Sequence, residues 1–516
     1  MSLSRRAFLQ LSGATAALVP TWPRFLAATS ESTALCRKLA SDPLRPQYHL
    51  LPAHNWMNDP NGPIFFRGRY HMFHQYNPLG ATWGNMNWAH ATSPDMIHWE
   101  HQPIAISPTP NGPDRDGVFS GSAVLDHGKP TLIYTAVARP ARGAHATLRD
   151  GAHVWRETQC LAVAQDDDLR TWTKLPEPVI ASPPAGMPVT GFRDPALWRE
   201  GDKWMLILGS GTVANGGIVL LYASADLRHW TYLHPLVEGS PSGKKSPNPV
   251  GSGDMWECPD FFPLGNKHVL LISTMGKVRW KVGTYTNQRF TSEKEGVVDW
   301  GSYYAAKTML DAAGTLILWG WIPETRPDSE LIAAGWAGAM SLPRILSLSP
   351  QNELQTTVAP AAQVLRDQRI GIDPQQHASA RAKALGTLHI TNIAAEIDLE
   401  LQPRNDTFIL RLLSQDDTVF VTLTCEKQGT ERQLRVDSVI APLTGPATAP
   451  VRLHMFLDGS VLEVFANETT SLTARIYQAV SGPLHFTLDD GAEIASLNIW
   501  NLKAISKDRL TGSLCA

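Results

Sequence analysis

The sequence predicts an all-β protein in which a β-propeller is followed by a C-terminal β-sandwich. Three observations carry this prediction. A motif that ends in tryptophan recurs three times, short apolar runs fill the intervals between the copies, and apolar and polar residues alternate over residues 385–505. Long helical periodicity is absent from the sequence, which favours strands throughout.

The first 28 residues predict an export signal. Ser4-Arg5-Arg6-Ala7-Phe8 resembles a twin-arginine signal, and it is followed by an apolar stretch over residues 11–20 and by a cleavage region at Ala27-Ala28. The apolar stretch is too short for a permanent membrane helix. We therefore expect export to the periplasm or the cell exterior, with no membrane attachment after residues 1–28 are removed.

Residues 46–350 are predicted to form the propeller. The tryptophan motif occupies residues 93–99, 166–172 and 224–230, and a turn of this kind after a short apolar run is typical of a repeated antiparallel blade. The runs predicted as strands are residues 70–76, 131–137, 204–208, 269–273 and 316–319.

Residues 360–510 are predicted to form the β-sandwich. Apolar and polar residues alternate at positions 408–413 and 461–465, and Asp458-Gly459 is a hairpin turn signal. Asp458 and Glu463 lie in this hairpin pattern, and we expect them to be solvated surface residues that protect an edge.

Composition and charge narrow the partners. Lys and Arg number 45 against 48 Asp and Glu, the net charge is −3, and no basic block is present, so a nucleic-acid partner is not indicated. The five cysteines are scattered without a CxxC or Cys/His cluster. The sequence therefore predicts no metal site, no cofactor and no disulfide framework.

One carboxylate stands out because its turn is rigid. Asp59 lies in Asn58-Asp59-Pro60-Asn61-Gly62, where Pro60 restrains the backbone and Asn61-Gly62 favours a chain reversal. Taken alone, this segment could be an ordinary loop. Asp194 and Glu257 lie in two further proline-braced segments, Arg193-Asp194-Pro195 and Trp256-Glu257-Cys258-Pro259. Three such carboxylates favour a catalytic set.

In this order, residues 58–62, 193–195 and 257–259 resemble the three signature blocks of glycoside hydrolase family 32, which contains invertases, levanases, inulinases and fructan exohydrolases. Residues 75–78, 83–90, 119–123 and 335–338 resemble its other shared stretches, so the likeness covers residues 46–505. The resemblance implies a five-bladed propeller whose innermost strands converge on an axial pocket, followed by a sandwich.

The resemblance also implies roles for the carboxylates. Asp59 would be the nucleophile, Glu257 the acid/base, and Asp194 would hold the fructosyl hydroxyls and stabilise the transition state. The amides around Asp59 favour its ionised form, whereas the apolar neighbours of Glu257 favour its protonated form. Arg193 would keep Asp194 charged and oriented, although an Arg-Asp dipeptide can also be a structural ion pair. Cys258 is expected to be a packing residue.

Seven residues are expected to bind substrate, and a mobile loop over residues 239–253 is expected at the pocket rim, just before Glu257. Indole faces stack on sugar rings, although most of the 17 tryptophans should lie in the core. The seven are Asn58, Gln75, Trp83, Ser120, Arg193, Trp56 and Trp336.

The predicted function is that of a retaining, exo-acting β-fructofuranosidase that removes terminal fructose from sucrose or fructans such as inulin and levan. A fructosyltransferase with the same three carboxylates is one alternative. A non-catalytic fructan-binding protein is another, which the intact carboxylate set disfavours. Residues 273–277 carry no carboxylate where plant-type invertases hold the glucose of sucrose with an acidic residue, which favours fructan over sucrose.

Overall fold

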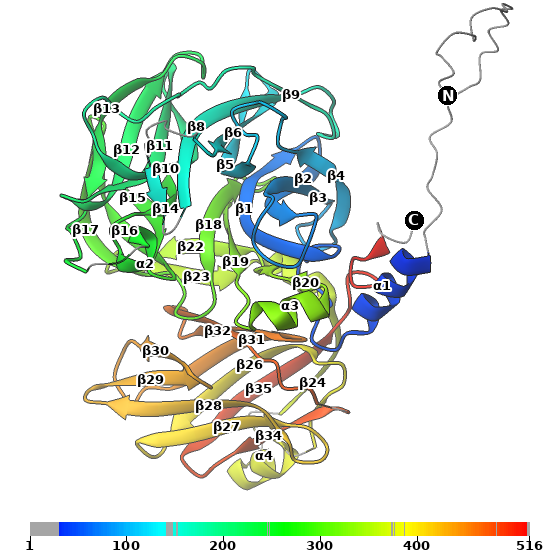
Figure 1. Cartoon of the computed structure of the whole chain (residues 1–516). Helices are drawn as coiled ribbons and strands as arrows, with labels where there is room; N and C mark the ends of the chain where they lie inside the picture. The colour runs from blue at the N-terminus through cyan, green and yellow to red at the C-terminus, as the bar shows by residue number, and fades with distance from the viewer. Residues whose placement is uncertain are drawn as a thin grey trace, which may run out of the picture.

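The computed structural model describes residues 30–140, 148–150, 153–244, 246, 248–372, 375, 377–385, 387–480 and 482–512. It shows an upper lobe built from small sheets and a lower lobe of two stacked sheets (Figure 1). The expected export signal, residues 1–28, lies outside the described residues. Helices are few and short: α1 (Ser30–Ser41), α2 (Pro249–Ser252), α3 (Asp328–Ala334), α4 (Ala378–Leu385) and the 3-10 helix Pro360–Leu365.

The upper lobe contains antiparallel sheets that follow one another along the chain. The first has the order β20 (Trp336–Ala337), β1 (Asn55–Phe66), β2 (Arg69–Asn77), β3 (Asn87–Ser93) and β4 (Glu100–Ile106), with β20 parallel to β1. The second contains β5 (Gly117–Asp126), β6 (Lys129–Ala138), β8 (His153–Ala164) and β7 (Leu148–Asp150), with β9 (Trp172–Lys174) also paired to β8.

Three further sheets complete this lobe among the described residues. The third is β10 (Val189–Glu200), β11 (Lys203–Thr212), β12 (Gly216–Ser224) and β13 (Thr231–Glu238), and the fourth is β14 (Glu257–Leu264), β15 (Lys267–Thr274), β16 (Lys277–Thr286) and β17 (Arg289–Val297). The last is β18 (Tyr304–Leu310), β19 (Leu316–Ile322), β22 (Arg344–Leu348) and β23 (Leu354–Val358), with β21 (Ala339–Met340) on β19.

The first main strand of each sheet lies towards the middle of the upper lobe. Contacts run from β1 to β5, β5 to β10, β10 to β14, β14 to β18, and from β18 back to β1 (Figure 1). The apolar runs predicted from the sequence are confirmed as strands, and each is the second strand of its sheet: β2, β6, β11, β15 and β19. This propeller arrangement explains how residues far apart in sequence can meet near one axis.

The repeated tryptophan motif forms a repeated turn between the outer strands. In the first copy, Asp95 accepts the backbone N–H groups of Ile97 and His98 at 3.0 and 2.8 Å, and in the third copy Asp226 accepts those of Arg228 and His229 at 2.9 and 2.9 Å. An aspartate that binds the backbone two and three residues on is a standard turn device. The first and third copies thus share one turn, whereas in the second copy Asp166 accepts from the N–H groups of Arg170 and Thr171 at 3.0 and 2.7 Å.

The lower lobe is a β-sandwich of two six-stranded sheets around one large apolar core. One sheet has the order β24 (Arg366–Ile372), β35 (Ala492–Leu502), β26 (Ala394–Pro403), β31 (Val451–Asp458), β32 (Val461–Ala466) and β33 (Thr470–Arg475). The other has β25 (His389–Ile390), β34 (Leu484–Leu488), β27 (Thr407–Leu413), β28 (Val419–Gln428), β29 (Glu431–Val436) and β30 (Val439–Leu443).

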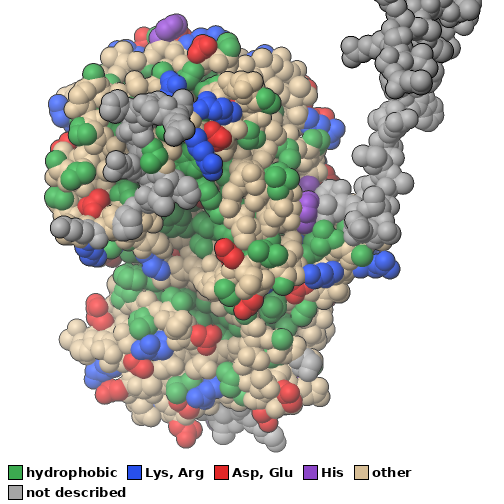
Figure 2. Space-filling view, viewed as in Figure 1, with side chains coloured by type: hydrophobic (Ala, Val, Ile, Leu, Met, Phe, Trp, Pro, Cys, Tyr) green, Lys and Arg blue, Asp and Glu red, His purple; other side chains and the backbone are tan. Residues whose placement is uncertain are grey.

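The expectation that Asp458 and Glu463 are surface residues is wrong. Both are 0% exposed, because the face of β31 and β32 that should meet water packs against the upper lobe instead. Hydrophobic side chains gather along the seam between the lobes (Figure 2). Strand alternation shows which residues share a face but does not show whether another domain covers that face.

His49 and Arg344 carry the charge that matches these two buried acids. The His49 ring contacts Asp458 Oδ2 at 2.8 Å and Glu463 Oε1 at 3.0 Å. Arg344 pairs with Glu463 at 2.5 Å and with Asp299 at 2.9 Å. The seam between the lobes therefore holds a buried network of ion pairs, and removing one partner of such a pair strongly lowers the stability of the fold.

Two smaller findings concern a cysteine of α1 and the described helices as a group. Cys36 on α1 is disulfide-bonded, which the scattered cysteine spacing did not indicate. In the part of the chain that the structure describes, none of the helices has the length and apolar character needed to cross a membrane.

Candidate functional site

Each innermost strand bulges at the same place. In each bulge, three residue steps along the inner strand lie opposite two steps along the neighbouring strand. The bulges span Met57 to Pro60, Val118 to Gly121, Arg193 to Ala196, Glu257 to Asp260, and Tyr304 to Lys307. A bulge re-aims the side chains around it. Asp59, Ser120, Asp194 and Glu257 all lie within or next to these bulges, so one repeated backbone feature directs them to a common centre.

Backbone conformation confirms that these bulges are unusual. Asp194, Cys258 and Ala305 each follow the last regularly paired residue before the bulge, and their φ values are 64°, 45° and 54°. Residues other than glycine adopt this left-handed region seldom and at a cost, and such positions concentrate at functional sites. The structure therefore maintains local strain where the carboxylates converge.

Asp59 is partly exposed and is held by two donors. Asn58 Nδ2 donates to Asp59 Oδ1 at 3.0 Å, and Ser120 Oγ donates to Asp59 Oδ2 at 2.5 Å. These two hydrogen bonds fix the orientation of the Asp59 carboxylate. Gln75 supports both donors, since Asn58 Nδ2 donates to Gln75 Oε1 at 3.1 Å and Gln75 Nε2 donates to Ser120 Oγ at 2.6 Å. Trp56 adds a 2.8 Å bond to Asn58.

Asp194 is buried and touches the element that carries Glu257. The Cys258 N–H donates to Asp194 Oδ2 at 2.9 Å, and the Cys258 thiol lies 3.4 Å from Asp59 Oδ2 and 3.5 Å from Asp194 Oδ2. The pKa of Asp194 is raised from 3.8 to about 7, chiefly by burial; the charge of Arg193 opposes the rise, and the charges of Glu257 and Asp59 add to it. Three carboxyl groups thus share one small volume.

Glu257 is held at both oxygens. Arg193 donates to Glu257 Oε1 from Nη2 at 2.8 Å and from Nε at 3.2 Å, and the Tyr304 hydroxyl donates to Glu257 Oε2 at 2.8 Å. Arg193, Glu257 and Tyr304 occupy the same position before the bulge on three consecutive inner strands. Arg193 and Tyr304, at the equivalent positions of the two adjacent inner strands, therefore fix the orientation of the Glu257 carboxyl.

Arg193 is oriented by a second acid. Glu157 Oε1 accepts from Arg193 Nη1 at 2.9 Å, and Glu157 Oε2 accepts the Phe192 N–H at 2.6 Å. The sequence did not indicate Glu157 or Tyr304, because neither lies in a proline-braced segment as the three carboxylates do. Only the bulge register, which is a property of the paired strands, identifies Tyr304.

Trp83 and Trp336 are placed differently from one another. Trp83 is 46% exposed and lines an open pocket, as expected for a residue that meets a sugar. Trp336 is 0% exposed, donates from Nε1 to Asp42 Oδ2 at 2.8 Å and packs with Leu39 of α1. A fully buried indole offers no face to a substrate, so we correct the expectation for Trp336 to a packing role.

The segment over residues 239–253 is anchored in its described parts. Ser242 N donates to Asp254 Oδ1 at 2.7 Å, and Asn248 caps α2 by accepting from the N–H groups of Val250 and Gly251 at 3.0 and 3.1 Å. The Trp256 N–H also donates to Ser210 O at 3.1 Å, directly before Glu257. These hydrogen bonds of Asp254 and Asn248 hold in place the chain segment that leads to Glu257.

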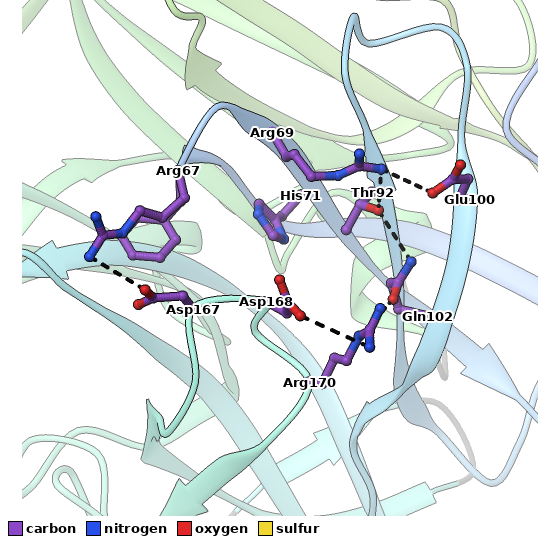
Figure 3. Close-up of a pocket in the computed structure, with 10 residues that line it drawn as sticks. Arg67, Arg69, His71, Thr92, Glu100, Gln102, Asp167, Asp168 and Arg170 are labelled. Atoms are coloured by element: carbon purple, nitrogen blue, oxygen red, sulfur yellow. Dashed lines mark hydrogen bonds and ion pairs between the residues drawn. The ribbon is translucent and has the colours of Figure 1, made fainter.

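A charged depression of 220 Å³ lies on β2, β3, β4 and the turn between β8 and β9, and none of the three carboxylates lines it (Figure 3). Its charges pair with one another: Arg67 with Asp167 at 3.5 Å, Arg69 with Glu100 at 3.1 Å, and Arg170 with Asp168 at 4.0 Å. Such exposed pairs contribute little individually. Of these three pairs, Arg67–Asp167 links the first two sheets. Among the described residues, no group of three His, Cys, Asp or Glu side chains could hold a metal ion.

Comparison with known proteins agrees with the fold. Residues 49–358 match the N-terminal domain of glycosyl hydrolases family 32, and residues 367–501 match the C-terminal domain of that family. The chain is similar to a sucrose-6-phosphate hydrolase of Zymomonas mobilis, with 32% identity over 95% of this chain and 99% of that protein.

Two further relatives extend this likeness. A raffinose invertase of Escherichia coli is 32% identical over 84% of this chain and 89% of its own length. The solved structure of a β-fructofuranosidase from Bombyx mori superimposes with a TM-score of 0.70 at 26% identity, covering 92% of this chain and 99% of that chain.

Proposed function

Because the chain belongs to glycosyl hydrolase family 32, we propose that it is a retaining, exo-acting β-fructofuranosidase that hydrolyses terminal fructosyl bonds of sucrose or fructans. The observation that carries this proposal is the convergence of Asp59, Asp194 and Glu257 at equivalent bulges of the inner strands β1, β10 and β14. The names of the relatives, which include invertases and a β-fructofuranosidase, support the substrate class.

In the proposed reaction, Asp59 attacks the anomeric carbon while Glu257 protonates the leaving oxygen. Retention requires the two carboxyl groups to lie about 5 Å apart on opposite sides of the bond. The 3.4 Å contact between the Cys258 thiol and Asp59 supports this, because it brings the residue after Glu257 against the nucleophile. Water then attacks the fructosyl intermediate with Glu257 acting as base.

Asp194 binds the fructosyl hydroxyls in this scheme. Its raised pKa, about 7, lets the carboxyl act as donor or acceptor near neutral pH. Arg193 and Tyr304 position Glu257 through the hydrogen bonds described above. The amide of Asn58 and the hydroxyl of Ser120 position Asp59.

The proposal includes the architecture expected for this activity. We infer a five-bladed propeller over residues 46–350, in which each upper-lobe sheet is one blade, and a sandwich domain over residues 360–510. The circular contacts of β1, β5, β10, β14 and β18 support the blade count. Export through the twin-arginine signal at residues 1–28 is part of the same proposal, and fractionation of cells that express the full chain would test it.

Time courses with sucrose, inulin and levan test the proposed function. We predict that free fructose appears from the earliest times, because binding energy concentrated on one terminal unit favours single-unit release. Chromatography of the products measures this. Early oligosaccharides without fructose would indicate an endo-acting enzyme, new fructosyl chains would indicate a transferase, and binding without products would indicate a binding protein.

A second prediction concerns metals. Dialysis against a chelator should leave fructose release from sucrose unchanged, because Asp59, Asp194 and Glu257 together supply nucleophile, stabilising charge and proton. A large loss that returns when a divalent cation is restored would contradict this scheme. The parent enzyme dialysed without chelator is the control.

A further inference from the structure

A pocket of 670 Å³ opens beside the nucleophile, on the side of the first two sheets. Phe119 forms part of its wall, and the next residue, Ser120, donates the 2.5 Å hydrogen bond to Asp59. The pocket wall is therefore joined to the reacting carboxylate through the adjacent residues Phe119 and Ser120 of β5. The three carboxylates act on the terminal fructosyl unit that is cleaved, whereas this pocket lies beyond that unit.

The pocket wall is aromatic. Trp83 and Phe119 meet edge to face at 5.9 Å, and Phe119 and Trp155 meet in the same way at 6.1 Å. Trp83 keeps 46% of its surface exposed, so its face is open to the pocket, and the apolar faces of sugar rings stack on such surfaces. The wall is thus suited to rings rather than to extended apolar chains.

The rim is polar and nearly balanced in charge. The Arg139 guanidinium lies 5.6 Å from the centre of the Trp155 ring. The backbone N–H of Arg139 donates to Asp116 Oδ2 at 2.7 Å, and the Arg115 side chain donates to the backbone carbonyl of Arg139 at 2.6 Å. A guanidinium fixed over an indole presents several N–H donors in one plane. Because Asp116 offsets part of the positive charge, the rim suits the hydroxyl and ether oxygens of a neutral sugar.

The size of the pocket decides how much of the substrate it can hold. Pockets that enclose ligands larger than a single ring have volumes of about 300 to 1,000 Å³, and this one, at 670 Å³, lies well inside that range. A second opening, lined by Trp256, Met275 and Arg279, has 370 Å³. Of these two openings, the one between Trp83 and Arg139 is the roomier.

Building on the proposed function, we propose that this pocket binds the second and third sugar units of the leaving chain, and that Arg139 sets a preference for fructo-oligosaccharides over sucrose. Sucrose has a leaving group of a single sugar unit and does not reach this pocket. A trisaccharide or tetrasaccharide reaches Trp155 and Arg139 and gains binding energy there that is used in the reaction.

The test compares kcat/KM for sucrose with kcat/KM for inulin-type oligosaccharides of three and four units. We expect the parent enzyme to favour the tetrasaccharide, and Arg139→Gln to lower the ratio of tetrasaccharide to sucrose about five- to tenfold, the effect of losing roughly one hydrogen bond. Arg199→Gln is the matched control, since Arg199 also lies over an indole, 4.7 Å from the centre of the Trp204 ring, but lines none of these pockets.

Three results would overturn the proposal. One is a parent enzyme with no chain-length preference, and another is an Arg139→Gln enzyme that is reduced equally on every substrate. The third is an Arg279→Gln enzyme that loses the preference while Arg139→Gln keeps it, which would place the chain in the 370 Å³ opening. Failure to release fructose from any substrate would instead defeat the proposed function itself.

Discussion

Replacement of Asp59 by Asn should abolish turnover while the protein stays folded, because the amide keeps the shape of the side chain but cannot form the fructosyl bond. We expect kcat on sucrose or inulin to fall on the order of ten-thousandfold. Glu257→Gln should lower kcat about a hundred- to ten-thousandfold, the usual contribution of a general acid. Fructose release and circular dichroism of each variant measure both effects.

A substrate with a good leaving group separates the two roles. Glu257→Gln should recover part of its first step on β-fructofuranosyl fluoride, whose departure needs little protonation, whereas Asp59→Asn should recover none. Glu100→Gln is a control, since Glu100 pairs with Arg69 on the exposed surface. Parent-like rates in Asp59→Asn would show that another group is the nucleophile.

The second large effect concerns the seam between the lobes. Glu463→Gln should lower the free energy of unfolding by about 3 to 5 kcal/mol, because Arg344 and His49 each lose one of their two buried carboxylate partners and keep only Asp299 and Asp458, respectively. Urea unfolding of the full chain, followed by fluorescence and by circular dichroism, measures the loss. Glu400→Gln breaks an exposed pair with Arg452 in the same sheet and should cost about 1 kcal/mol or less. Equal losses in the two variants would contradict the buried network.

The same network predicts a pH window. Asp458 and Glu463 raise the pKa of His49 from 6.5 to about 9 despite its burial, so its contribution to stability is full below pH 6.5 and disappears as the pH rises through 9. The pKa of Glu463 is lowered from 4.5 to about 2 by Arg344 and His49, against the effect of burial. Its contribution is present above pH 4.5 and is lost as the pH falls towards 2. In Glu463→Gln both edges of this window should flatten.

Much of the site could be predicted because its chemistry is local. Asp59, Asp194 and Glu257 each stand beside a proline in a short segment, and those segments became the bulged parts of β1, β10 and β14. The apolar runs became the second strands of the sheets for the same reason, since strand periodicity is a property of neighbouring residues.

The features that could not be predicted depend on partners far away in sequence. Glu463 reads as a surface residue until β32 is placed against Arg344 and His49. Trp336 reads as a sugar platform until α1 covers it. Tyr304 has no local signal at all, and only the shared register of β10, β14 and β18 shows that it faces Glu257.

Capture of the covalent intermediate tests the central claim most directly. In Glu257→Gln, β-fructofuranosyl fluoride should load the nucleophile, and the intermediate should persist because no general base activates water. Mass spectrometry after proteolysis should then find one fructosyl unit on the peptide that contains Asp59. An adduct on another residue, or turnover of the fluoride with inverted configuration and no adduct, would contradict the double displacement at Asp59.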